Sequence, residues 1–91
     1  MTMMNDAGEL GNWAERIGSR EEFAVFVRAL TENLRAHPSE WENATLPEFL
    51  EALAAWVEDL PGYFHNRGLA VPEPPDWRTF ALVLSAARIY E

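Results

Sequence analysis

Three side chains within residues 63–67 carry groups that acid–base chemistry and anion binding use. Tyr63, His65 and Arg67 bring a phenol, an imidazole and a guanidinium into one short segment. An imidazole titrates near neutral pH and can act as a base, and a guanidinium can bind a carboxylate through two parallel hydrogen bonds. Together with Glu42, this segment is a candidate site for a small-molecule binder or an enzyme. The alternative is an ordinary surface loop. This alternative is favoured, because no second histidine and no nucleophile lies nearby in the sequence.

The two histidines of the chain form no metal-binding pattern. His37 and His65 are separated by 27 residues, and the chain contains no cysteine. Zinc sites draw their ligands from short, regular spacings, which are missing here. The sequence therefore predicts no metal and no other cofactor, and the lack of cysteine excludes disulfides and zinc–thiolate sites.

The segment Trp41-Glu42-Asn43 is the most distinctive short motif. As a functional site, Glu42 and Asn43 would form a small polar binding point beside the aromatic wall of Trp41. As a structural element, Trp41 would fill the core while Asn43 and Thr45 satisfy backbone groups at the start of the next helix. The structural interpretation is favoured, because these residue types are typical of helix starts.

A group of acidic residues offers a different kind of site. No arginine or lysine lies between Arg35 and Arg67. The acids of this stretch are Glu40, Glu42, Glu48, Glu51, Glu58 and Asp59. A helix face that carries acids among small residues can bind a basic protein. The candidate partner-binding residues are therefore the four acids of the predicted helix and the polar residues of the 63–67 segment: Glu48, Glu51, Glu58, Asp59, Tyr63, His65 and Arg67. The alternative is a solvated face that keeps a small protein soluble.

Three helices are expected to position these residues. Each begins with a capping residue: Ser19 and Thr45, each followed three residues later by glutamate, and Asp76. Apolar residues then recur at the three- and four-residue spacing of an amphipathic helix. The predicted helices span residues 20–36, 45–60 and 77–90.

The remaining segments are expected to be irregular. Pro61 and Gly62 are predicted to end the second helix, and residues 61–76, with four prolines and two glycines, to form a long ordered loop. Residues 1–12 are small or polar and aperiodic, which predicts a flexible N-terminal arm. Residues 13–91 form the single predicted domain.

The two later helices carry the expected core. The apolar face of the second comprises Leu46, Phe49, Leu50, Leu53, Trp56, Val57 and Leu60. The third is apolar almost all round, so it is buried centrally or lies at an interface. Trp56 and Trp77 are predicted to be largely buried, and either to lie near one another or to share neighbours such as Leu53 and Phe80. Leu82, Ala86 and Ile89 form a second face, which either pairs with another copy in a homodimer or is covered by the N-terminal segment and the 61–76 loop.

Length and charge limit the class of protein. Ninety-one residues make one domain, and the net charge of −8 argues against nucleic acid and anionic membrane as partners. No apolar run reaches the roughly 20 residues of a membrane span, and the first residues do not form a signal peptide. We therefore expect a cytoplasmic protein.

The chain resembles a small bacterial family of single-domain hypothetical proteins, a domain of unknown function. The resemblance covers roughly residues 17–91 and rests on a Trp-Glu-Asn-x-Thr-Leu motif and a Trp-x-x-Phe-Ala…Tyr-Glu ending. The matching residues are Trp41, Glu42, Asn43, Thr45, Leu46, Phe49, Leu50, Trp56, Trp77, Phe80, Ala81, Tyr90 and Glu91. The resemblance implies a bacterial source and a compact helical fold, and it implies no activity.

These observations favour an all-α bundle without enzymatic function. No nucleophile with a base, metal cage or phosphate-binding loop is visible in the sequence. The leading hypothesis is a protein-interaction module that uses the acidic helix face or the aromatic 63–67 loop. By charge and size it is similar to immunity proteins and antitoxins, small acidic proteins that neutralise basic partners.

Overall fold

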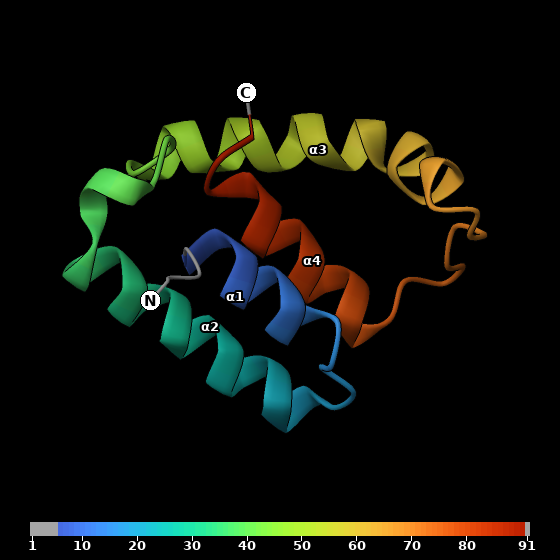
Figure 1. The fold of residues 1–91 in the computed structure, drawn as a ribbon, viewed down its shortest axis with the longest axis horizontal. Helices are drawn as coiled ribbons and strands as arrows, with labels where there is room; N and C mark the ends of the chain where they lie inside the picture. Colours follow the sequence, from blue (N-terminus) through green and yellow to red (C-terminus); the bar gives the residue numbers. More distant parts are fainter. Residues whose placement is uncertain (1–5, 91) are drawn as a thin grey trace.

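The computed structural model describes residues 6–90, and all regular structure in this range is helical. The elements are α1 (Asp6–Ala14), α2 (Arg20–Ala36), the short 3-10 helix η1 (Pro38–Glu40), α3 (Leu46–Asn66) and α4 (Trp77–Ala87). In Figure 1, α3 lies across one side of α4, and α1 and α2 lie on the other. The predicted all-α class and small-bundle architecture are confirmed.

Helix α1 corrects the irregular arm that was predicted from residue 1 to residue 12. From residue 6 onwards this segment is helical, and residues 1–5 lie outside the described residues. Leu10, Ala14 and Ile17 are buried, and their spacing of four and three places them on one side of the chain. Glycines obscured the helix in the sequence, because glycine is a poor helix former. Burial against the rest of the core outweighs this weak propensity.

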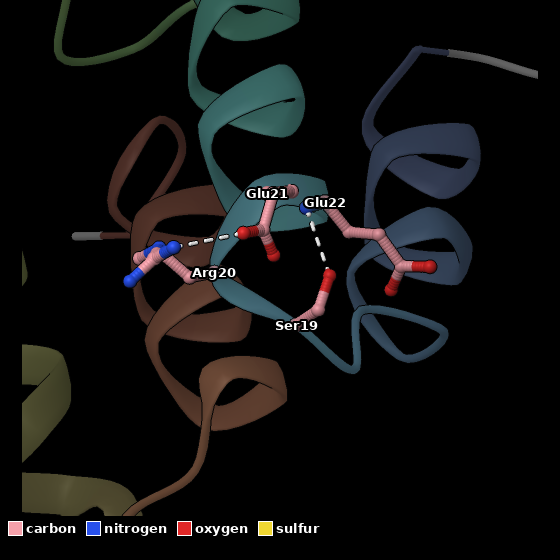
Figure 2. A network of polar contacts seen from close by, with 4 residues as sticks. All are labelled: Ser19, Arg20, Glu21 and Glu22. Carbon is pink, nitrogen blue, oxygen red and sulfur yellow. Dashed lines mark hydrogen bonds and ion pairs between the residues drawn. The ribbon is translucent and has the colours of Figure 1, made fainter.

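Helix α2 begins and ends at the predicted residues. The Ser19 hydroxyl accepts a hydrogen bond from the backbone N–H of Glu22 at 3.1 Å (Figure 2). The Glu22 carboxylate accepts from the backbone N–H of Gly18 at 2.7 Å, one residue before the reciprocal partner that a capping box uses. Figure 2 also shows the exposed ion pair of Arg20 and Glu21, at 2.9 Å. The N-cap prediction is confirmed, with the second bond shifted by one residue.

Helix α3 continues through Pro61, where the sequence had predicted its end. A proline inside a helix removes one backbone hydrogen bond and costs about 3 kcal/mol. Aromatic packing beyond the proline offsets this cost. Tyr63 lies 5.1 Å from the ring of Trp56, and Phe64 is buried. Tertiary contacts therefore override the local stop signal.

Gly68 provides the actual end of α3. It adopts a positive φ of 71°, which glycine tolerates and other residues rarely adopt. Its N–H donates to the carbonyl of His65 at 3.0 Å, and the N–H of Leu69 donates to the carbonyl of Phe64 at 2.9 Å. This pair of bonds is a Schellman motif, which satisfies the last carbonyls of a helix. The loop before α4 is therefore confined to residues 67–76.

Helix α4 is the centre of the bundle, because α1, α2 and α3 all pack against it. Its buried residues alternate along the sequence and so lie on two opposite sides of the helix, at 100° per residue. They are Thr79, Ala81, Val83, Ser85 and Ala87. Most of them are small, which lets three neighbouring helices approach closely. The sequence predicted that this helix is either buried centrally or lies at an interface, and the central placement is confirmed.

The ends of α4 follow the sequence only in part. Asp76 caps the first turn as predicted: its carboxylate accepts from the backbone N–H and the hydroxyl of Thr79, at 2.8 and 2.7 Å. The helix ends at Ala87 rather than at residue 90. The prediction that Trp77 is largely buried is wrong. Trp56 is 7% exposed but Trp77 is 37% exposed, and its ring packs 5.4 Å from that of Phe23.

Candidate functional site

Three glutamates of α3 form an exposed acidic face. Glu48, Glu51 and Glu58 recur at spacings of three and seven residues, which places them on one side of the helix. Within residues 6–90, none of the three makes an ion pair with a basic side chain. A shallow hollow of about 500 Å³ lies beside Glu48 and Glu51, next to Tyr90. The acidic face therefore offers unpaired carboxylates around a recess.

Asp59, the fourth predicted acid of this helix, is engaged within the fold. The hydroxyl of Tyr90 donates a hydrogen bond to its carboxylate. This bond, with a smaller effect of burial, raises the pKa of Tyr90, because losing the proton would set a phenolate against a carboxylate. The contact fastens the segment after α4 to the middle of α3. Asp59 is therefore less accessible to a partner than the three glutamates.

The Trp41-Glu42-Asn43 motif joins the two long helices. Trp41 is buried, donates from its indole N–H to the Asn33 side chain at 2.6 Å, and packs 5.8 Å from the ring of Phe49. The buried guanidinium of Arg88 lies 5.6 Å from the centre of the Trp41 ring. The expected core role of Trp41 is confirmed, while Glu42 is exposed.

Asn43 acts at a different helix end from the one predicted. Its side-chain amide donates to the carbonyls of Ala87 and Tyr90, at 2.9 and 2.8 Å, and its backbone N–H donates to the carbonyl of Arg88 at 2.9 Å. These carbonyls belong to the end of α4, where a helix leaves acceptors unsatisfied. Asn43 therefore caps α4 rather than the start of α3. No local pattern could reveal this, because the bonded residues lie 44 and 47 positions away.

Four of the five residues of the aromatic segment 63–67 lie in the last turn of α3, and Arg67 is its C-cap. The Arg67 guanidinium lies 4.9 Å from the centre of the Tyr63 ring, a cation–π contact, and His65 is exposed. Tyr63 and Arg67 line an opening of about 350 Å³ with Arg78. Glu42 precedes the other end of this helix, which is about 30 Å long at 1.5 Å per residue. The structure therefore does not bring Glu42 to the 63–67 segment.

The histidines also remain apart. His37 follows α2, where its backbone N–H donates to the carbonyl of Asn33 at 2.8 Å, and its ring lies 3.9 Å from the Glu40 carboxylate. His65 lies near the end of α3. In Figure 1 the end of α3 and the end of α2 lie on opposite sides of the molecule. Among the described residues, no group of three metal-binding side chains comes together.

An apolar groove beside α3 was missed in the sequence. It has a volume of about 430 Å³ and is lined from α2, α3 and α4. Its lining residues are Phe23, Leu53, Val57, Leu60, Pro75, Thr79, Phe80, Val83 and Leu84. The sequence assigned all apolar residues of α3 to the core, but Leu46, Leu50 and Val57 are exposed. The signal was the width of the apolar stripe, which exceeds what one packing partner can cover.

The chain belongs to the family of unknown function DUF7660, whose model matches residues 19–91. The family begins at the N-cap of α2 and includes both α3 and α4. No curated protein and no solved structure matches the chain. Across the described residues, no helix combines the length and the apolar character that crossing a membrane requires.

Proposed function

We propose that this chain is a non-enzymatic protein-interaction domain whose acidic face on α3 binds a basic partner protein. The observation that supports this proposal is the set of Glu48, Glu51 and Glu58, exposed on one side of a helix and without an ion pair in the described residues. Like charges on one helix face repel each other weakly, so a basic partner would gain from neutralising them. An immunity- or antitoxin-like role in the cytoplasm is the functional type that fits this chemistry.

The shape of the acidic face agrees with this function. Ala52 and Ala55 leave a shallow recess beside the glutamates, and Tyr90 closes one side of it. An arginine or lysine from a partner could enter this recess and meet carboxylates at its rim. Such a contact speeds association and weakens with added salt, because exposed charges are screened over about 10 Å at 0.1 M salt.

The test compares two glutamine variants with the same change in net charge. In the first, Glu48, Glu51 and Glu58 become glutamine; in the control, Glu9, Glu21 and Glu32 do, which lie on α1 and α2. Each chain is immobilised and exposed to a lysate of the source organism at low and high salt. We expect a basic protein to be retained by the wild type and the control, released by salt, and lost by the α3 variant. Equal retention by both variants would contradict the proposal.

A second candidate function rests on the opening at the end of α3. Arg67 and Arg78, two of the seven arginines in an acidic chain, line it together with Tyr63 and Leu69. Glu15 also lines the opening, and Arg78 lies 3.6 Å from the carboxylate of Asp76. A small organic carboxylate would bind the two guanidiniums in competition with these acids. Thermal unfolding with a series of small carboxylates tests this: a ligand that stabilises the wild type should not stabilise Arg67→Gln or Arg78→Gln. If no carboxylate shifts the midpoint, the opening is not such a site.

A further inference from the structure

Helix α3 carries a second surface that the proposed function does not use. Five apolar residues recur along it at spacings of four, three, four and three, the repeat of a coiled-coil seam. These residues, which we term the heptad seam, are Leu46, Leu50, Leu53, Val57 and Leu60. We infer that the heptad seam, with the aromatic residues of α4 beside it, forms the surface on which a second copy of this chain binds.

Three of the five residues of the heptad seam are exposed in their own chain. The side of α3 that packs inward runs through Phe49, Ala52 and Trp56. By contrast, Leu46 is 68% exposed, Leu50 52% and Val57 45%. At 100° per residue, the two sets lie on adjacent sides of the helix. The apolar stripe of α3 therefore has two sides: the inward side is covered, and the heptad seam is covered only in part, at Leu53 and Leu60.

The apolar groove gives the heptad seam a shape that a second molecule can fill. Val57 lies on one side of the groove and Phe80 on the other, and Phe80 is 44% exposed. A ridge of leucine and valine is the kind of projection that fits between two such walls. Each copy offers both the ridge and the groove, so two copies related by a two-fold axis could place each ridge in the groove of the other.

The charge pattern beside the heptad seam favours an identical partner. The row next to it consists of Pro47, Ala54 and Pro61, none of which is charged. In coiled coils, charges in this row select or exclude partners. Glu51 and Glu58 lie one row further from the heptad seam. Where the seams of two identical copies come closest, no glutamate therefore faces another glutamate. A basic partner would gain nothing at this row, which separates the seam from the acidic face.

The exposed area fits a moderate dimer. Leu46, Leu50, Val57, Trp77 and Phe80 are between 37% and 68% exposed. At about 150–250 Å² for a large side chain, they leave on the order of 500 Å² for burial. A stable interface needs about 800 Å² per partner, and the uncharged row and the rest of the groove lie next to this surface. We therefore expect a dimer that dissociates on dilution.

The face named from the sequence for a homodimer offers less surface. Leu82 is partly buried and packs against the cluster that contains Leu10, Ala14 and Ile17 of the N-terminal segment. Ala86 is also partly buried, and only Ile89 is well exposed. The N-terminal segment was the expected alternative cover for this face. Five large apolar side chains are exposed on α3 and the start of α4: Leu46, Leu50, Val57, Trp77 and Phe80.

Analytical ultracentrifugation of the full chain over a micromolar concentration series tests this inference. Leu50→Glu and Val57→Glu place a charge at exposed positions of the heptad seam. Val25→Glu is the matched control, since Val25 is 55% exposed on α2 and lines a different hollow. Ile89→Glu tests the face named from the sequence. Circular dichroism establishes whether each variant is folded. If a seam variant is unfolded, Leu50→Ser takes its place.

We expect the mass of the wild type to rise toward that of a dimer as the concentration increases. The Val25→Glu and Ile89→Glu variants should show the same rise as the wild type. Folded Leu50→Glu and Val57→Glu chains should remain monomers at every concentration. A wild type that is monomeric throughout would overturn the inference, as would a dimer that survives both seam substitutions or that only Ile89→Glu dissociates. None of these outcomes depends on the glutamates of the acidic face, which are unchanged in all variants.

Discussion

Helices α4 and α3 differ in how much of their surface is covered by neighbouring helices. Helix α4 is short, and three other helices pack against it, so it has buried residues on two opposite sides. Helix α3 is nearly twice as long and has one inward side, which leaves an acidic face and an apolar seam uncovered. A helix in a small bundle can therefore hold the fold through one side alone. The rest of α3 is open to partners.

The largest expected effect separates the inward side of α3 from its seam. Trp56→Ala should lower the free energy of unfolding by about 3–5 kcal/mol, because it leaves a cavity in the core beside Tyr63. Leu50→Ala, on the same helix, should cost less than about 1 kcal/mol in the monomer, because Leu50 is exposed. Urea unfolding of dilute protein measures both. Similar losses in the two variants would show that the seam is part of the monomer core.

The next effect tests how α3 is fastened to α4. Asn43→Asp keeps the shape of the side chain but removes the amide that donates to the carbonyls of Ala87 and Tyr90. We expect a loss of about 2 kcal/mol, at roughly 1 kcal/mol for each hydrogen bond. Glu42→Gln is the control, because the neighbouring Glu42 is exposed. A midpoint of unfolding that stays at the wild-type value in Asn43→Asp would mean that Asn43 does not hold the end of α4.

A smaller effect compares the first turns of the two helices. Asp76 accepts two bonds below 3 Å from Thr79, whereas the Thr45 hydroxyl accepts one bond of 3.4 Å. Asp76→Ala should therefore cost about 1–2 kcal/mol, and Thr45→Ala about 0.5 kcal/mol, the lower end of N-cap effects. The midpoints of denaturant unfolding of Asp76→Ala and Thr45→Ala show which variant loses more stability. The reverse order would indicate that α3 depends on its cap more than α4 does.

Acid should reveal the same cap on α4. The hydrogen bonds from Thr79 lower the pKa of Asp76 below its usual 3.8. The unfolded chain then takes up the proton first, so the stabilisation is present above pH 3.8 and is lost as pH falls through the lowered pKa. Thermal unfolding between neutral and acidic pH should show a steeper loss for the wild type than for Asp76→Asn. Parallel curves would place the acid sensitivity elsewhere.

The smallest effect concerns the contact between Tyr90 and α3. Because the bond to Asp59 raises the pKa of Tyr90 above 10.0, its contribution is complete below that pH. The contribution is lost as pH rises through the raised value. Tyr90→Phe should therefore unfold at a slightly lower temperature than the wild type near neutral pH, and the difference should shrink in alkali. A difference that is constant with pH would exclude this hydrogen bond as its cause.

The sequence predicted correctly those helix starts that depend on interactions between residues close together in the chain. Ser19, Thr45 and Asp76 start helices in the structure as the pattern indicated, because an N-cap bond spans only three residues. The end of α3 was misplaced, since the stop signal at Pro61 competes with burial of Phe64, and burial depends on the finished fold.

The candidate site divides in the same way. The acidic face follows from helical spacing alone, and it lies where the sequence placed it. The bonds from Asn43 to the end of α4 and from Tyr90 to Asp59 join residues 31 to 47 positions apart. No spacing rule reaches that far. The exposure of Trp77 was missed for the same reason, because Phe23, the residue that it packs against, belongs to another helix.

The central position of α4 has a consequence for how the chain folds. The helix that α1, α2 and α3 all pack against follows them in the sequence, so the contacts of α1 and α2 with α4 join residues far apart in the chain. During synthesis, α1, α2 and α3 emerge before their common partner and cannot complete the core. We expect the domain to fold in one cooperative step after α4 leaves the ribosome, more slowly than a helical bundle built from neighbouring hairpins. A fragment that stops before Trp77 should remain largely unstructured until an α4 peptide is added.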